Sequence, residues 1–517
     1  MLEESGRQAM DAKCPLANLA MLCSVPRLQP PGLRAELIKF LRVAIVVTLE
    51  VLLLLQSAGN AVSLRAADKI DRYIMKEMKR QHIPGLAVGV YRQGRIVKAK
   101  GYGLADLEQN VRVKPVTMFE SGSIGKQFTA TGIMMLVEQG KISLDDSITK
   151  YFPGAPATWE PVKVKHLLSH TSGIGDYSTR ALTQRHASFD YRSDFTEDEL
   201  LSRIEALPLV FQPGEEWKYC NTNYMLLGML IHKVTGQFYG DFLAQHIFKP
   251  LGMISTRVFS EVDIIPHRAS GYELKEGRVW NQEWVSQTFN SIAAGGLYIN
   301  IPDLAKWDAA LYSNQLLRQS SLNKMWAIFL QNDGQANKGN YGFGWVINTV
   351  NGHRILQHEG AWRGFSTVIV RYPDDGLTVT ILVNLDAQHT RLFKFAQQVA
   401  GMYNSALTPD TLEPIRDTNP GLTRSLRQTL LSILTGKPNP EDFTPKMREG
   451  FFPDFVKDLG EYFRKDGPMM SFELVKSSHQ NTGWVRKYFV TLRDNTYYFD
   501  FTVNPDGKIA HMGFAPE

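Results

Sequence analysis

The stretch Ser123-Ile124-Gly125-Lys126 decides the fold of this chain. Apolar residues recur with helical spacing after it, up to Gly140, whereas the segment before it lacks this pattern. Because residues three apart are neighbours on a helix, the lysine can take the proton of the serine hydroxyl. Free N–H groups at the start of a helix favour the negative charge that develops there. S-x-x-K alone also occurs on solvent-exposed helices, so the prediction of a serine nucleophile depends on companion motifs.

A second short pattern, Tyr219-Cys220-Asn221, follows a Pro-Gly turn signal and precedes an apolar helical run that begins at Asn223. We therefore expect Tyr219 and Asn221 on a connecting loop. A nearby lysine ammonium would stabilise the tyrosine phenolate, so the tyrosine could act as a base and then as an acid. The asparagine amide can hold a lysine and a substrate carbonyl. Cys220 is interpreted as a small buried residue and not as a nucleophile.

The third pattern is His358-Glu359-Gly360. Two β-like runs follow it, 366–372 and 377–384, and Pro-Asp-Asp-Gly between them is a strong hairpin signal. A glycine on an edge strand lets a substrate backbone approach closely, and the neighbouring N–H can donate to an oxyanion. A structural histidine would also explain this pattern, so its weight comes from its position after the other two.

The order and spacing of S-x-x-K, Y-x-N and H-x-G resemble the serine β-lactamase and penicillin-binding-protein superfamily. Within it, the chain is most similar to the class C β-lactamase-related branch, which includes DD-peptidases, D-aminopeptidases, family VIII esterases and the mitochondrial β-lactamase-like protein. Three further stretches agree with the resemblance, namely Gly140–Asp146, Lys165–Ile174 and Ala294–Tyr298. The resemblance covers roughly residues 64–405.

The resemblance implies a role for each matching residue. Ser123 would attack a carbonyl and form an acyl-enzyme, while Lys126 and Tyr219 would share the proton transfers. Asn221 would position Lys126 and the substrate. His358 would stand where many relatives have lysine. The remaining expectations are a strand kept bare at Gly360 and an oxyanion hole formed by the backbone N–H groups of Ser123 and Ala361.

Two departures from the family pattern bear on the substrate. The third motif is not K-T-G, so the fixed cation that holds a substrate carboxylate becomes His358, which puts efficient β-lactam hydrolysis in doubt. Glu359 replaces a hydroxyl residue, so a carboxylate could face the cleft and repel a substrate carboxylate or select an amine. It could equally point away, because neighbouring residues on a strand face opposite sides.

Other functional classes find little support in the sequence. No G-x-S-x-G pattern of an α/β-hydrolase is present. His166 and His170 have the spacing of helical metal ligands but lack the glutamate of H-E-x-x-H, so we interpret them as packing and hydrogen-bonding residues and expect no metal. No cofactor is expected. A net charge of +5 over 517 residues indicates no nucleic-acid partner, so the expected partner is a small molecule or peptide substrate.

The first 61 residues are predicted to direct export. The mostly apolar run 41–55 contains Arg42 and Glu50 and is short for a membrane span. Small residues at 57–61 suit a signal peptidase, with cleavage after Ala61. The exported part, periplasmic or secreted, would keep only Cys220 of the three cysteines and form no intramolecular disulfide. The alternative is an uncleaved segment that anchors the protein in a membrane.

The rest of the chain predicts two folded domains. Strand-like runs at 86–91 and 96–102, a mostly helical middle and strands again near 340–384 predict an α/β fold of the α+β type. We expect an antiparallel sheet flanked by helices, plus a helical subdomain, with the cleft between them, as in β-lactamase/transpeptidase-like hydrolases. This domain is expected over 62–405, with a linker at 406–420. A small α+β domain, faintly similar to cystatin- or NTF2-like modules, is expected over 421–517, with helices at 422–434 and 451–463 and strands at 470–476, 485–493 and 496–503.

Two functions remain open at this point. The first is an exported serine hydrolase that cleaves a peptidoglycan peptide, a D-amino-acid peptide or a short-chain ester through a Ser123 acyl-enzyme. The second is a wall-binding, peptide-binding or sensory protein that uses the same cleft without turnover. The presence of all four residues Ser123, Lys126, Tyr219 and Asn221 favours the hydrolase, because a binding protein has no need of this set. Pocket shape selects among the substrates, and the sequence leaves them and the oligomeric state open.

Overall fold

The structure is a computed structural model of the full chain, and it describes residues 69–178, 189–386, 390–408, 414–464, 466–480, 483–493 and 495–516. The chain divides into the compact units Met1–Asp71 and Arg72–Glu517, so nearly all described residues belong to the second unit. The predicted export or anchor segment and residues 409–413 of the predicted linker lie outside the described residues. Within the described ranges, no helix is long and apolar enough to cross a membrane.

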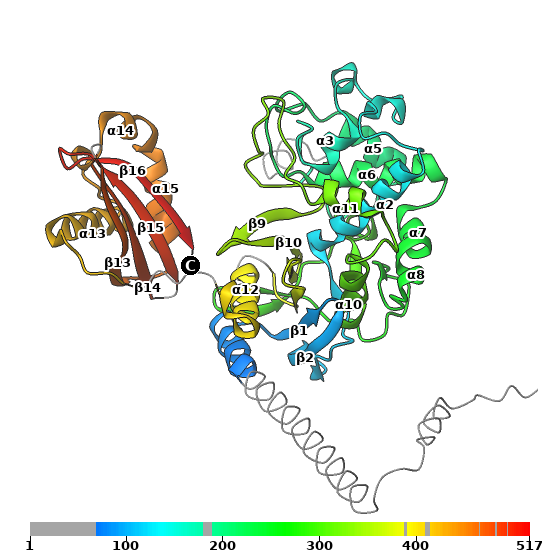
Figure 1. The fold of residues 1–517 in the computed structure, drawn as a ribbon, viewed down its shortest axis with the longest axis horizontal. Helices are drawn as coiled ribbons and strands as arrows, with labels where there is room; N and C mark the ends of the chain where they lie inside the picture. Colours follow the sequence, from blue (N-terminus) through cyan, green and yellow to red (C-terminus); the bar gives the residue numbers. More distant parts are fainter. Residues whose placement is uncertain are drawn as a thin grey trace, which may run out of the picture. The chain divides into compact units, whose positions relative to one another are not determined.

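A seven-stranded antiparallel sheet joins the early part of the hydrolase region to its end, because β1 pairs with β12. Both strands are mostly apolar and buried along nearly all of their lengths; helix α10 (Ile301–Ala310) contacts β1 and β12, and helix α12 (Leu392–Tyr403) contacts β11 and β12 (Figure 1). The strand order is β3-β2-β1-β12-β11-β10-β9. The strands are β1 (Gly85–Arg92), β2 (Arg95–Asp106), β3 (Val111–Arg112), β9 (Val346–Val350), β10 (His353–Trp362), β11 (Phe365–Tyr372) and β12 (Leu377–Val383).

Strand β10 carries the third motif and is an edge strand over only part of its length. β9 pairs with β10 from His353 to Gln357, whereas the residues from His358 to Trp362 pair only with β11 on the other side. The predicted edge position of the third motif is therefore present locally, although β9 is the edge strand of the whole sheet.

The helical part carries the first two motifs. The apolar runs that predict α2 (Gly125–Glu138) and α6 (Asn221–Thr235) are buried along most of their lengths, and the two helices contact each other (Figure 1). The shorter helices of this part are α3 (Val164–Leu168), α5 (Glu197–Glu205), α7 (Tyr239–Leu243), α8 (Lys249–Leu251), α9 (Gln287–Asn290) and α11 (Gln319–Met325). Three short strands, β4 (Phe119–Glu120), β8 (Leu297–Ile299) and β5 (Arg257–Val258), form a small sheet, in which β4 ends just before Ser123, and β6 (Tyr272–Lys275) pairs with β7 (Arg278–Asn281).

The C-terminal elements form a separate hydrophobic core. Side chains of β14 and β15 alternate between buried and less buried, as expected for a sheet with one covered face. Two details of the prediction were wrong. The helix expected over 451–463 begins only after Pro453, as α15, and an unpredicted helix, α14, precedes it; a fourth strand also follows the predicted three. The elements are α13 (Pro420–Leu434), α14 (Pro445–Phe451), α15 (Asp454–Arg464), β13 (Met469–Gln480), β14 (Gly483–Leu492), β15 (Thr496–Val503) and β16 (Ile509–Pro516).

Candidate active site

Ser123 lies in a tight turn, the 3-10 turn η1 (Gly122–Ile124), which directly precedes α2. Gly122 has φ +49°, a conformation that favours glycine, and a Cβ on it would lie 2.5 Å from the backbone nitrogen of Ala361. On the other side, a Cβ on Gly295 would lie 2.6 Å from the carbonyl carbon of Gly122. Backbone contacts that only glycine allows therefore hold the turn between β10 and the segment before β8.

Gly360 completes this close packing. A Cβ on it would lie 2.1 Å from the carbonyl oxygen of Ser121, which also accepts a 2.6 Å hydrogen bond from the Thr367 hydroxyl. We predicted that the missing side chain at Gly360 lets a substrate approach the strand. In the structure it lets β10 pack against the turn that carries Ser123. The same packing brings the Ala361 backbone N–H, on the locally free edge of β10, next to the turn of Ser123.

Lys126 makes three short contacts through its Nζ atom. It lies 2.9 Å from the Ser123 Oγ, 2.9 Å from the Asn221 Oδ1 and 2.7 Å from the carbonyl oxygen of Ala294. The last two atoms can only accept hydrogen bonds. When the lysine is neutral, its two protons are therefore used by Asn221 and Ala294, and its lone pair is directed at the Ser123 hydroxyl.

Burial makes this neutral form accessible. The Lys126 side chain is fully buried, and desolvation lowers the pKa of its ammonium to about 7. The carboxylate of Asp176 opposes the shift by favouring the charged form. Near neutral pH the lysine can thus both accept and return a proton.

Tyr219 lies on the other side of Lys126, whose Nζ is 4.9 Å from the tyrosine ring centroid. Its hydroxyl oxygen is buried and has no hydrogen-bond partner among the described residues. Burial raises the pKa of Tyr219 above its ordinary value, and the nearby Ser123 hydroxyl offsets part of the rise. The ring of His170 packs at 4.4 Å from that of Tyr219, and its Nδ1 accepts a hydrogen bond from the backbone of Cys220.

Asn221 is the first residue of α6, so it does not lie on the loop that we predicted. Its position is held by Asp176, whose Oδ2 accepts the Asn221 backbone N–H at 3.2 Å. The Asn221 amide nitrogen donates to Ser178 at 3.3 Å, and the Ser178 hydroxyl donates to the second oxygen of Asp176 at 2.9 Å. Sequence reasoning missed Asp176, because an isolated aspartate on a loop carries no motif.

His358 lies in the same cleft but its ring nitrogens bond within the protein. The Nδ1 atom is 2.6 Å from the carbonyl oxygen of Glu359, which can only accept, so this nitrogen carries the proton. The Nε2 atom then accepts a 2.8 Å hydrogen bond from the hydroxyl of Tyr341, a residue that sequence reasoning also missed. Burial lowers the pKa of His358 to about 3, and the charge of Lys126 adds to this shift. The histidine is therefore neutral at physiological pH.

Glu359 points toward the start of α12, and its side chain is exposed. Its Oε1 accepts a 3.2 Å hydrogen bond from the backbone N–H of Phe393. The N-terminus of a helix favours a carboxylate. Although the residue keeps contact with solvent, the surrounding protein partly desolvates its carboxyl group and raises the pKa of Glu359, and this hydrogen bond offsets part of the rise.

The cleft has two lobes that meet at Ser123, Tyr219 and Ala361. The β10 lobe has a volume of about 350 Å³ and is lined further by Trp217, Tyr341, Val346, His358, Glu359, Gly360, Ser366, Thr367, Thr390 and Leu392. The aromatic lobe has a volume of about 280 Å³ and is lined further by Gly122, Tyr177, Ser178, Asn221, Phe289, Ile292, Ala294, Gly295, Gly296 and Trp362. Cavities of this size suit a small ester, amide or peptide end.

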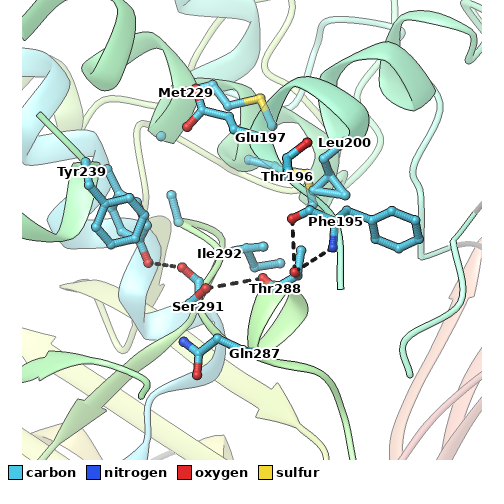
Figure 2. A pocket seen from close by; sticks show the side chains of 14 residues that line it. Phe195, Thr196, Glu197, Leu200, Met229, Tyr239, Gln287, Thr288, Ser291 and Ile292 are labelled. Atoms are coloured by element: carbon cyan, nitrogen blue, oxygen red, sulfur yellow. Dashed lines mark hydrogen bonds between the residues drawn. The ribbon is translucent and has the colours of Figure 1, made fainter. Parts of the chain in front are cut away.

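A third cavity, of about 210 Å³, lies next to the aromatic lobe and shares Ile292 with it (Figure 2). Figure 2 shows that polar groups around it bond to one another, such as the hydroxyl of Tyr239 to the carbonyl of Ser291 and the backbone N–H of Phe195 to the hydroxyl of Thr288. The candidate active site is the two-lobed cleft, because that is where Ser123 and Lys126 lie.

Two residues that we interpreted as structural have structural surroundings. Cys220 is buried, its Sγ lies 3.4 Å from the carbonyl oxygen of Ile174, and burial raises the pKa of its thiol to about 12. His166 accepts the backbone N–H of Lys163 at the start of α3. Within the described ranges, no group of three or more His, Cys, Asp or Glu side chains could hold a metal ion.

Sequence comparison places the chain among proteins of one family. The sequence model of the Beta-lactamase family matches residues 70–400. Penicillin-binding protein 4* of Bacillus subtilis (strain 168) is 32% identical over 336 residues, which are 60% of this chain and 73% of that protein. Protein flp of Staphylococcus aureus (strain MW2) is 29% identical over 339 residues, which are 62% of this chain and 64% of that protein.

Solved structures with the same fold agree with this placement. The octameric penicillin-binding protein homologue from Pyrococcus abyssi has a TM-score of 0.57 at 24% identity and covers 87% of this chain and 95% of its own. D-amino acid amidase from Ochrobactrum anthropi SV3 has a TM-score of 0.55 at 24% identity, over 66% of this chain and 97% of its own. A D-stereospecific amidohydrolase from Streptomyces sp. has a TM-score of 0.51 at 27% identity, over 62% of this chain and 93% of its own. The chain therefore belongs to the beta-lactamase family and is a serine hydrolase.

Proposed function

We propose that this chain is an exported hydrolase that cleaves an ester or amide through an acyl-enzyme on Ser123. The observation that carries the proposal is the set of three contacts of Lys126. Asn221 and Ala294 use the two protons of the neutral lysine, so its lone pair is aimed at the Ser123 hydroxyl. Export is proposed from the N-terminal sequence, whose apolar run ends in small residues suited to a signal peptidase.

The proposed reaction has two halves. Neutral Lys126 takes the Ser123 proton as the oxygen attacks the substrate carbonyl, and the backbone N–H groups of Ser123 and Ala361 stabilise the oxyanion. The leaving group departs with a proton supplied from Lys126, with Tyr219 as a partner in the transfer, and an ester remains on Ser123. Water then attacks this ester by the same route in reverse, which releases the acid and regenerates the serine.

The substrate classes that suit this apparatus are peptidoglycan peptides, D-amino-acid peptides and amides, and short-chain esters. The D-stereospecific amidohydrolase, by its name, supports amide substrates of D configuration. The aromatic lobe supports a substrate with an apolar group, because Tyr177, Phe289 and Trp362 line it.

The alternative is a protein that binds a cell-wall component or peptide in this cleft without turning it over. The exact set of proton-transfer contacts around Ser123 favours the hydrolase, because binding alone does not need a neutral lysine. An activated serine reacts with a fluorophosphonate, whereas an unactivated one does not.

The test is the intact mass of the full-length protein after incubation with a fluorophosphonate, with the adduct mapped by peptide. We expect one adduct, on Ser123, that is absent from Ser123→Ala. The matched control is Ser172→Ala, since this buried serine follows the helical segment α3 and bonds to Asn223 outside the two lobes. Absence of an adduct on folded wild-type protein would contradict the acyl-enzyme proposal and support the binding protein.

A further inference from the structure

The hydroxyl groups that line the β10 lobe already donate within the protein. The Thr367 hydroxyl donates to the carbonyl of Ser121 at 2.6 Å, and the Ser366 hydroxyl donates to the carbonyl of Leu385 at 2.8 Å. The Thr390 hydroxyl donates to that of Ser366 at 3.0 Å. Each hydroxyl has a single proton to donate. These groups therefore have no donor left for an anion in the lobe.

The side-chain nitrogen atoms of the lobe, those of His358 and Trp217, are no more available. His358 uses its one proton on the carbonyl of Glu359 and its other nitrogen to accept from Tyr341. The indole nitrogen of Trp217 has no hydrogen-bond partner among the described residues, but it is buried out of contact with the open space of the lobe. The Tyr219 hydroxyl remains, and the proposed mechanism uses it for proton transfer.

Glu359 contributes the one formal charge among the described side chains that line the lobe, and this charge is negative. Its carboxylate is held at the lobe by the Phe393 backbone N–H at the start of α12. An anion that entered the lobe would leave water and compete with the reacting groups for the Tyr219 hydroxyl and the Ala361 backbone N–H, and the Glu359 carboxylate would repel it.

We propose that the β10 lobe excludes a carboxylate, so that the substrates are esters or amides whose group in this lobe is uncharged. This inference rests on the acyl-enzyme function proposed above and narrows its substrate class. Peptides with a free carboxylate next to the scissile bond are then poor substrates, and the corresponding peptide amides or esters are better ones.

Three aryl esters test the inference on the full-length protein. The neutral ester is meta-carbamoylphenyl phenylacetate. The second ester, meta-carboxyphenyl phenylacetate, carries a carboxylate on the leaving group, and the third, meta-carbamoylphenyl para-carboxyphenylacetate, carries it on the acyl group. The measured quantity is kcat/KM for each ester divided by its rate of hydrolysis by hydroxide. We expect at least one charged ester to react at least about tenfold more slowly than the neutral ester.

Substitution of Glu359 then tests whether its negative charge causes the preference for the neutral ester. Glu359→Gln removes the negative charge and keeps the shape, so it should raise kcat/KM of the disfavoured charged ester relative to the neutral one by about tenfold. Asp374→Asn is the matched control. It removes a carboxylate on the hairpin between β11 and β12, which is 61% exposed and pairs with Arg354 of β10. The control should leave the ratio unchanged.

The inference is overturned if neither charged ester is disfavoured, or if Glu359→Gln and Asp374→Asn change the ratio equally. Where Ser123 is labelled but no ester is turned over, the same ratios come from the protection that each ester gives against fluorophosphonate labelling. A folded protein with neither labelling nor turnover contradicts the acyl-enzyme function and this inference together. Labelling of Ser123 with equal rates for all three esters contradicts this inference alone.

Discussion

The helical wall and the strand wall of the cleft each contain a buried nitrogen base, and they use it in opposite ways. Neutral Lys126 on α2 donates hydrogen bonds to two acceptors, and its lone pair faces the Ser123 hydroxyl. His358 on β10 donates to a carbonyl and accepts from the hydroxyl of Tyr341, so neither ring nitrogen is available to a substrate in the cleft. Burial lowers the pKa of both groups, so burial alone does not distinguish them. The hydrogen-bond partners decide which base can react.

Removal of the lysine should have the largest effect. Lys126→Met replaces the base by an apolar side chain of similar length, and we expect the rate of fluorophosphonate labelling of Ser123 to fall by about 10³-fold or more. Lys141→Met is the matched control, because Lys141 is exposed just beyond the end of α2. Near-normal labelling in Lys126→Met would contradict the role of the helical wall, and equal losses in the two variants would point to a general structural effect.

The pH dependence of Ser123 labelling should distinguish Lys126 from His358, and this is the next largest expected effect. The reactive form is neutral Lys126, whose pKa is lowered to about 7, so the labelling rate should rise with pH up to about 7 and level off above it. Below the pKa the expected slope is about tenfold per pH unit. His358, with a pKa of about 3, should add no inflection in this range. The measurement is the second-order labelling rate against pH, and a rate that falls as pH rises would contradict the assignment.

Removal of the Tyr341 hydroxyl should have the smallest effect on activity. Tyr341→Phe leaves the buried Nε2 of His358 without its donor, which should lower the free energy of unfolding by about 1–3 kcal/mol. Because the ring nitrogens of His358 bond to Tyr341 and to the Glu359 carbonyl and not to Ser123, we expect labelling rates within about tenfold of wild type. The stability measurement is the urea concentration at which labelling of Ser123 is lost.

Tyr372→Phe is the control for this substitution. The Tyr372 hydroxyl is buried and has no hydrogen-bond partner among the described residues, so its removal should cost no stability. Equal destabilisation by Tyr341→Phe and Tyr372→Phe would show that the bond to His358 contributes nothing.

The sequence predicted the reacting side chains of the site but not the backbone groups that contact them. The helical spacing of Ser123 and Lys126 predicted a contact that is present at 2.9 Å, and the strand predicted over 366–372 agrees with β11, Phe365–Tyr372. The carbonyl of Ala294, which completes the surroundings of Lys126, leaves no mark in the sequence because every residue has a carbonyl.

Other parts were missed because their partners are distant in the chain. Tyr341 bonds His358 from outside the third motif, and no pattern links an isolated tyrosine to a histidine on another strand. Asn221 looked like a loop residue because its neighbours favour a turn, yet its backbone N–H is accepted by Asp176 at the start of α6. The strand β16, Ile509–Pro516, was missed because His511, Gly513 and Pro516 interrupt its apolar residues.

The glycine contacts at the nucleophile turn also limit how this enzyme can evolve. Side chains on Gly122, Gly295 or Gly360 would lie 2.1–2.6 Å from atoms of the neighbouring segments, so a substitution at any of them displaces the backbone next to Ser123. These positions cannot contribute to adaptation toward new substrates. Adaptation has to come from the side chains that line the two lobes, where a change in shape or charge leaves the turn intact. The fold thus separates the glycine positions that hold the turn of Ser123, where side chains do not fit, from the lobe-lining positions, where side chains can change.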